Sequence, residues 1–279
     1  MDTKKFSLQK IRKLHYKEQI KNLRLLGTDI NNFFKNPYTF FKSRYYIEVS
    51  ALLVFFLQFS RISPNFITTI YIILSLSVLF LLSSNNEILI LISVILLFTK
   101  GVLDWSDGLL ARIKNKTSNL GFLLDNWASL ISSYSYLLGL SIYIYNKNNE
   151  IIFLVTGVII VLLKALDIRN YGYLLAMYSL FKEKNKKNLL KKLNFKIHSK
   201  TPNSVGNPLM QKTKIFIQGF LDERSRSIDF VCLLIVIDTF FYPSDILKYL
   251  YFLIFFKNII IFVTGFYYVT NKGYIFKND

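Results

Sequence analysis

The chain has 279 residues, of which 52% are hydrophobic and 16% aromatic, and its formal net charge is +18. The apolar residues gather in long blocks, which is typical of a membrane protein and unlike an ordinary soluble domain. Eleven Lys/Arg lie within residues 4–44 and twelve within 182–226, whereas the apolar blocks between them are nearly free of charge. This placement favours contact with lipid head groups over nucleic acid, so we expect no nucleic-acid partner.

Cysteine and histidine are scarce. The single cysteine, Cys232, lies inside an apolar block, and the chain has only two histidines. One cysteine excludes an intrachain disulfide, and this set gives no basis for a zinc site built from thiolates and imidazoles. Any metal ion would therefore be bound by oxygen ligands. The polar, basic first 45 residues are not typical of a cleavable signal peptide.

Residues 1–60 form a basic N-terminal segment in our interpretation. Within residues 1–45, apolar positions recur among basic ones with an irregular helical period. This pattern predicts one or two amphipathic helices lying on the membrane surface, and the alternative is a solvated basic tail. The apolar run from Val49 to Phe59 is too short to cross a bilayer, so we predict that it is interfacial or leads into the first span.

Residues 61–279 predict a membrane domain of six transmembrane helices, so the predicted fold class is an all-α integral membrane protein with an interfacial N-terminal segment. The predicted helices cover residues 64–82, 88–112, 120–145, 151–166, 228–241 and 246–269. The basic residues of 171–227 predict a cytosolic insertion, on the same side of the membrane as both termini. The weakly charged turns would lie on the other side.

Three carboxylates flank the predicted junction between the second and third membrane helices, namely Asp104, Asp107 and Asp125. Asp104 and Asp107 are three residues apart and would share a face of one helix, and Asp125 would face them from its antiparallel neighbour. Carboxylates are costly in a membrane protein and would repel one another unless a cation neutralised them. Oxygen ligands alone select Mg²⁺, Mn²⁺ or Ca²⁺.

Small and basic residues accompany these acids at fixed spacing. Gly108 and Ala111 lie on the face of the aspartates and Gly121 lies on the next helix, where small side chains allow close helix packing. Arg112 ends the second helix, where a guanidinium could bind phosphate. The pattern reads Asp-x2-Asp-Gly-x2-Ala-Arg-x8-Gly-x3-Asp, from Asp104 to Asp125.

This pattern resembles the signature of the CDP-alcohol phosphotransferase family, also called the CDP-alcohol phosphatidyltransferase family. Seven of its eight fixed positions are present with the family's spacing. Pro64, Asn65 and Thr68 also resemble the Pro-Asn-x-x-Thr sequence that opens the family's first span. The resemblance covers about residues 60–270 and is consistent with the predicted six spans.

The resemblance implies a membrane-bound transferase of phospholipid or related biosynthesis. It would transfer a substituted phosphate from a CDP-alcohol to an acceptor hydroxyl and release CMP, with CDP-diacylglycerol as one candidate donor. The resemblance also implies Mg²⁺ or Mn²⁺ as cofactor, a cytoplasm-facing active site in a multi-pass protein, membrane lipids as surroundings, and a homodimer. The metal ligands would be Asp104, Asp107 and Asp125, and the nucleotide would bind at Gly108, Ala111, Arg112 and Gly121.

Ser129 departs from the family pattern, which has an aspartate at this position as the base that deprotonates the acceptor. A serine hydroxyl does not accept a proton near neutral pH, and losing a general base typically costs about 10²–10⁴ in rate. Asp125 would then be the nearest carboxylate for catalysis. Either the acceptor needs little base assistance, or a metal-bound hydroxide serves, or the protein is a non-catalytic relative that binds nucleotide or lipid. A transporter coupled to a cation or a proton would also explain acids in the membrane but not the spacing of the glycines and the arginine.

Overall fold

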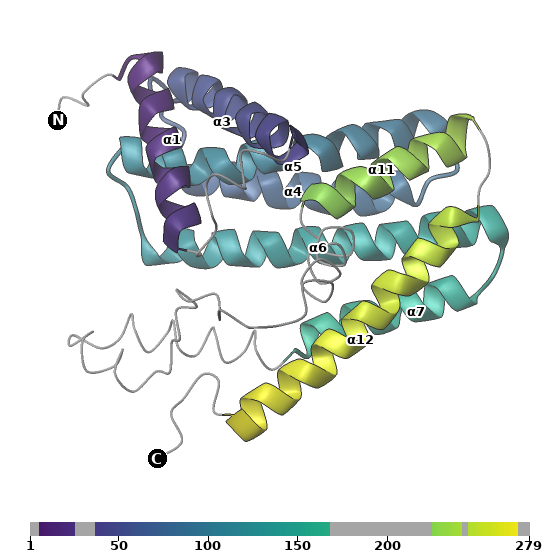
Figure 1. The fold of residues 1–279 in the computed structure, drawn as a ribbon. Helices are drawn as coiled ribbons and strands as arrows, with labels where there is room; N and C mark the ends of the chain where they lie inside the picture. Colours follow the sequence, from purple (N-terminus) through teal and green to yellow (C-terminus); the bar gives the residue numbers. More distant parts are fainter. Residues whose placement is uncertain (1–5, 26–36, 168–224, 242–244, 273–279) are drawn as a thin grey trace. The chain divides into compact units, whose positions relative to one another are not determined.

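The computed structural model describes residues 6–25, 37–167, 225–241 and 245–272, and every regular element in these ranges is an α-helix (Figure 1). The predicted all-α class is thus confirmed for the described residues. The helices are α1 (Leu8–Leu25), α3 (Pro37–Leu57), α4 (Pro64–Leu82), α5 (Glu87–Ile113), α6 (Asn119–Asn148), α7 (Ile152–Ala165), α11 (Ser225–Phe240) and α12 (Ile246–Lys272). Most of the basic segment 171–227 lies outside the described residues.

Local sequence signals set the ends of the helices that carry the signature. Pro64 is the first residue of α4, where its missing N–H costs nothing, and the Ser63 hydroxyl accepts the Phe66 N–H at 3.2 Å. The Ser118 hydroxyl caps α6 in the same way by accepting the Gly121 N–H at 3.0 Å. Asn115, with φ of 53°, ends α5 in the left-handed region that asparagine tolerates. The connector between α5 and α6 is therefore short and fixed at both ends.

Three helices are long and apolar enough to cross a membrane, and they are α4, α5 and residues 246–267 of α12. These correspond to the first, second and sixth predicted spans. The other three predicted spans coincide with α6, α7 and α11. Helices α7 and α11, with 14 and 16 residues, are shorter than the three helices above, and α6 carries several serines and asparagines. Length and composition alone therefore do not identify these three helices as membrane spans.

The described residues divide into two compact units. The first unit contains α1, α3, residues 64–78 of α4, residues 92–113 of α5 and the first part of α6 up to Ser135. The second unit contains residues 79–91, residues 136–167, α11 and α12. Helices α4, α5 and α6 each contribute to both units. The aspartates of the signature all lie in the first unit.

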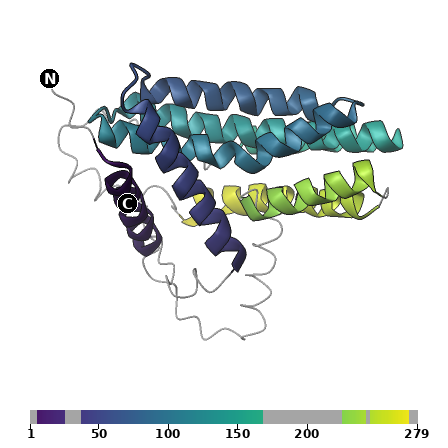
Figure 2. The same ribbon diagram turned by 90° about the horizontal axis from the view of Figure 1, so that it is seen from above.

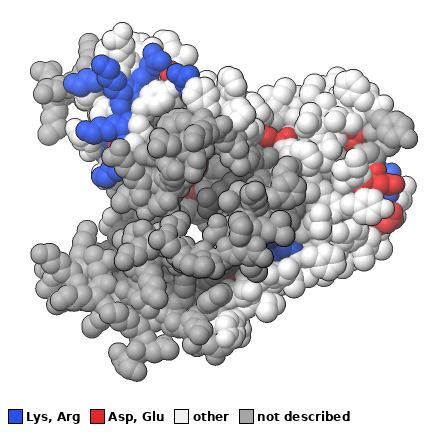
Figure 3. Space-filling model, in the orientation of Figure 1, with Lys and Arg blue, Asp and Glu red and all other residues white. Residues whose placement is uncertain are grey.

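In the first unit, α1 packs against α3, and both cover the end of α5 (Figure 1). Ile11 of α1 is fully buried in a cluster with Ala51 and Val54 of α3 and with Leu109 and Leu110 of α5. One side of α1 therefore faces the protein. Its exposed side is basic, as the space-filling view shows, with Lys10, Arg12, Lys13, Lys17 and Lys21 (Figure 3).

Helix α3 differs from the predicted division of the N-terminal segment. It runs without a break through residue 45, so the apolar run that begins at Val49 is the second half of a 21-residue helix. Aromatic and basic residues fill its first half, and Tyr46 fits against Gly101 of α5 so closely that a side chain at position 101 would collide with the tyrosine ring. The close approach of α3 and α5 thus requires a glycine at position 101.

Candidate active site

The two sequence motifs meet in the first unit, where α4, α5 and α6 run side by side (Figure 2). The Thr68 hydroxyl of α4 donates a hydrogen bond of 2.5 Å to Asp107 Oδ2 of α5. The Asn65 side-chain oxygen lies only 3.1 Å from the position that a Cβ atom on Gly121 would occupy. The Pro-Asn-x-x-Thr sequence therefore packs directly against the aspartate signature, and Gly121 leaves room for Asn65.

The three aspartates act on one another electrostatically. Asp104 feels the negative charges of Asp125 and Asp107, and the charge of Lys100 opposes them. Asp107 is buried, with 6% of its surface exposed, and also accepts a hydrogen bond from the Gly108 N–H. Like charges that interact in a protein interior destabilise it unless a cation or a proton compensates. The arrangement is therefore typical of a binding site.

The signature implies a divalent metal ion, and the donor chemistry fits one. The candidate ligands are all carboxylates, which Mg²⁺ and Mn²⁺ prefer. The Thr68 hydroxyl orients Asp107 by donating a hydrogen bond to it, as the outer-shell partner of a metal ligand does. With Asp107 turned toward Thr68, the described residues contain no group of three His, Cys, Asp or Glu side chains gathered around one point. The assignment of Asp104, Asp107 and Asp125 as metal ligands is a prediction from the sequence.

The other predicted site residues line the same end of the helices. A side chain on Gly108 would contact the Arg112 guanidinium at 3.4 Å, so Gly108 and Arg112 pack together. Ala111 is half-buried. Ser129 follows Asp125 by one turn and is exposed, with the buried Ala128 beside it. A hydroxyl thus stands where the family pattern has a carboxylate.

Helix α1 reaches the signature through an ion pair that sequence analysis missed. Glu18 Oε2 lies 2.5 Å from Nε of Arg112, and both side chains are about one third to two fifths exposed, at 32% and 42%. Glu18 is the one acidic residue in the sequence of α1, which is otherwise rich in Lys and Arg. A single acid on a basic helix is a signal that could have drawn attention to Glu18, although the neighbouring sequence does not indicate which residue it pairs with.

Two further contacts fix α1 in place. The His15 ring packs edge-on against Trp105, the residue after Asp104, with centroids 5.6 Å apart, and His15 Nε2 lies 3.1 Å from the Ser50 hydroxyl. Burial, and then the positive charge of Arg112, lower the pKa of His15 to about 4, so the ring is neutral at physiological pH.

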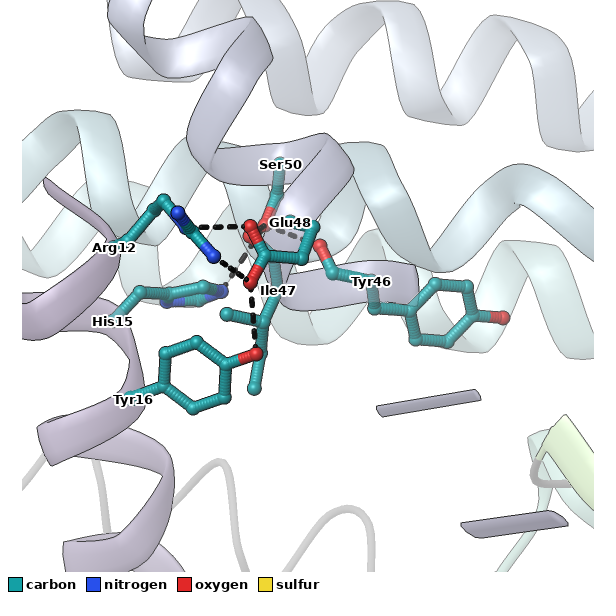
Figure 4. A network of polar contacts seen from close by, with 7 residues as sticks. All are labelled: Arg12, His15, Tyr16, Tyr46, Ile47, Glu48 and Ser50. Carbon is teal, nitrogen blue, oxygen red and sulfur yellow. Dashed lines mark hydrogen bonds and ion pairs between the residues drawn. The ribbon is translucent and has the colours of Figure 1, made fainter. Parts of the chain in front are cut away.

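Glu48 of α3 provides the other anchor (Figure 4). Arg12 Nε lies 2.6 Å from one of its carboxylate oxygens, and the Tyr16 hydroxyl donates a 2.9 Å hydrogen bond to the other. Although partial burial of Glu48 opposes ionisation, the bonds from Arg12 and Tyr16 hold the pKa of its carboxyl below the usual value. Helix α1 is thus docked independently of Glu18.

Comparison with known proteins agrees with these motifs. A family model described as CDP-alcohol phosphatidyltransferase matches residues 61–218, which is more than half of the chain and includes α4, α5, α6 and α7. A search of curated proteins gives no match. Helices α1 and α3, which cover the end of α5, lie before the matched region.

Proposed function

Because the chain belongs to the CDP-alcohol phosphatidyltransferase family, we propose that it transfers a substituted phosphate from a CDP-alcohol to an acceptor hydroxyl and releases CMP. The observation that carries this proposal is the bond between Thr68 and Asp107. It joins the two halves of the signature at a point where three carboxylates already interact. Phosphoryl transfer needs charge neutralisation and positioning more than covalent chemistry, and such a cluster is suited to that task.

We assign the residue roles by combining the family resemblance with the places of the residues along the helices. Asp104, Asp107 and Asp125 would hold Mg²⁺ or Mn²⁺. The ion, when bound, would neutralise the diphosphate and polarise the transferred phosphorus. Thr68 keeps Asp107 oriented. Asp125 would also take the proton of the acceptor hydroxyl, since Ser129 cannot.

The nucleotide would bind on the side of the connector between α5 and α6. Gly108, Ala111 and Gly121 leave the backbone accessible there, and Arg112 would contact a phosphate. In our proposal Glu18 is a positioning residue, because its ion pair holds the Arg112 guanidinium beside Gly108. The part of the chain before the family match would thus contribute to the site.

A second candidate function rests on Ser129. Without a carboxylate at this position, the protein could bind the nucleotide or a lipid and not catalyse transfer. CMP release separates the two functions, because both predict metal-dependent binding of CDP but only the enzyme predicts turnover.

We also propose that all six predicted spans cross the membrane and that the site faces the cytoplasm. The three long apolar helices and the family support an integral membrane protein. In α6 the serines at 129, 132 and 135 lower the hydropathy, and serines can face protein neighbours inside a membrane helix. A homodimer is part of the same proposal by resemblance to the family.

The decisive test is an assay of CMP release by the purified protein in lipid nanodiscs, with a panel of CDP-alcohols and acceptors. We expect release with at least one pair, abolished by EDTA and restored by Mg²⁺ or Mn²⁺. Metal-dependent CDP binding without release from any pair would favour the non-catalytic function. Absence of both binding and release in a folded sample would refute both.

A further inference from the structure

A cavity of about 310 Å³ lies in the first unit, next to the aspartates. This volume is at the lower end of the range for small-molecule sites. The walls come from α3, α4, α5 and α6 and are mostly aliphatic, with Val49, Leu74, Val78 and Leu97 among them. Neither motif of the family signature includes a residue of this cavity, so the roles proposed above leave it unexplained.

Polar side chains gather at the end of the cavity nearest the aspartates. Each of the three helices adds one such residue, a single turn beyond its part of the site: Tyr71 follows Thr68, Lys100 precedes Asp104, and Ser132 follows Ser129. Lys100 Nζ donates a 2.9 Å hydrogen bond to Ser132 Oγ. Tyr71 interacts with Asp104, Asp125 and Ser132. We refer to Tyr71, Ser75, Lys100 and Ser132 as the polar layer.

Ser75 indicates that the polar layer is built for a ligand. This residue is 4% exposed and lines the cavity, yet Ser75 Oγ makes no hydrogen bond among the described residues. The polar group that acts on it is the Tyr71 hydroxyl, which is also shared with Ser132. A buried hydroxyl left unpaired costs about 1–3 kcal/mol, so a ligand that pairs with it gains affinity.

The three helices place the cavity and the nucleotide side at opposite ends of the aspartates. On the nucleotide side lie Asn65, Gly121 and Arg112, and on the other side lies the polar layer, followed by the cavity. In phosphoryl transfer the attacking and leaving oxygens are roughly in line on opposite sides of the phosphorus. If CMP leaves toward Gly121, the acceptor must arrive from the polar layer.

We propose that this cavity receives the acceptor, and that the acceptor is an alcohol with an alkyl chain; the inference rests on the proposed function. The chain occupies the aliphatic part, and the hydroxyl reaches past the polar layer. Its oxygen forms a bond to the phosphorus of the substituted phosphate, while the bond from that phosphorus to the CMP oxygen breaks. The hydroxyl proton passes to Asp125 and then to water, so atoms and charge balance.

The cavity walls argue against a small polyol as acceptor. Its additional hydroxyls would lie against Leu74, Val78 and Leu97 without partners, at about 1–3 kcal/mol for each. An alkyl chain instead gains roughly 0.8 kcal/mol for each buried CH₂. The difference favours the amphiphile.

A cavity-filling variant tests the proposal. Val78 is buried in the cavity wall, so Val78→Phe should occupy the space without disrupting the core, whereas Ile73→Phe alters a position on α4 that is 59% exposed and serves as the matched control. We expect Val78→Phe to raise the KM for a medium-chain alcohol by about 10-fold or more and to leave the KM for the CDP-alcohol unchanged. Ile73→Phe should change neither constant.

Photolabelling makes the test independent of turnover. A medium-chain alcohol with a diazirine at the end of its chain, added with CDP and Mg²⁺ to nanodisc samples, should label Leu74, Leu97 or their neighbours. The label should disappear in Val78→Phe and remain in Ile73→Phe. Equal labelling of both variants, or labelling confined to exposed helix faces, would overturn the cavity as acceptor site. Labelling of the cavity without CMP release from any substrate pair would support the site and count against the proposed transfer.

Discussion

The two compact units both bury polar side chains, but they compensate them differently. In the second unit several buried groups bond to one another: the Tyr143 hydroxyl donates to Asp238 at 2.7 Å and lies 2.9 Å from the Thr239 hydroxyl. Tyr251 likewise donates to the Phe153 carbonyl oxygen at 3.2 Å. These groups form closed pairs, which stabilise a helix interface and leave little capacity for a ligand.

In the first unit the polar groups are placed at a cost. Three carboxylates on α5 and α6 oppose one another electrostatically, and the buried Ser75 hydroxyl makes no hydrogen bond among the described residues. Local arrangements that oppose stability are expected mainly at functional sites. The comparison therefore contrasts the Tyr143 and Tyr251 hydrogen bonds, which the protein itself completes, with the aspartates, whose negative charges oppose one another.

The largest effect is expected from removing one charge of the cluster. Asp107→Asn keeps an oxygen that can accept the Thr68 hydroxyl, so the packing should persist while the charge is lost. Metal-dependent CDP binding and CMP release should each fall by roughly 100-fold or more, because ligand carboxylates matter at least as much as their outer-shell partners. The matched control is Asp238→Asn in the second unit, which should retain CDP affinity as measured by calorimetry. Equal losses in both variants would erase the distinction between the units.

The next effect is a gain. Ser129→Asp would place a carboxylate one turn beyond Asp125, and with Mg²⁺ present it could accept the proton of the acceptor hydroxyl. CMP release should rise by about 10-fold or more, within the usual range for a general base. Ser129→Asn is of similar size but accepts no proton, so it should not increase turnover. If the aspartate variant folds, binds CDP and turns over no faster than the parent, the serine is not a defect of the site.

The sequence was most informative where local signals agreed. The first span was predicted as 64–82 and α4 has the same bounds, because Pro64 opens the helix and a polar turn follows it. The second predicted helix continued into the acidic stretch, as α5 does to Ile113. The aspartate face could be predicted because helical spacing alone places Asp104 and Asp107 together.

Contacts between distant residues could not be predicted in this way. The Thr68–Asp107 bond joins two motifs whose separate presence says nothing of their contact. The ion pair of Glu18 with Arg112 connects α1 to α5, which are separated in the sequence by α3 and α4. The first half of α3 lacks the apolar run that identified its second half. Tertiary packing decides such features, and it leaves no periodic trace in the sequence.

A smaller effect on function is expected from Glu18→Gln. The ion pair with Arg112 is partly exposed, and such pairs contribute about 0.2–1 kcal/mol, so the Kd for CDP should rise a few-fold at most. Glu48→Gln removes the other carboxylate that anchors α1 but does not touch Arg112, and it should leave the Kd unchanged. High salt should reduce the difference between Glu18→Gln and the parent. If both variants weaken CDP binding alike, Glu18 acts only by docking α1.

The smallest effect on turnover is expected from Tyr143→Phe in the second unit. The change removes the hydroxyl bonded to Asp238 and Thr239 and leaves polar atoms unpaired, so unfolding should become easier by about 1–3 kcal/mol. Turnover per folded molecule should not change, because the closed pair has no part in the site.

Tyr71→Phe in the first unit should have the opposite pattern. Its hydroxyl interacts with Asp104, Asp125 and Ser132, so its loss should raise the KM for the acceptor clearly and lower the melting temperature only slightly. Melting curves and CMP-release kinetics of the two variants, measured in the same nanodiscs, decide between these outcomes. A loss of turnover in Tyr143→Phe with little loss of stability would show that the second unit also carries function.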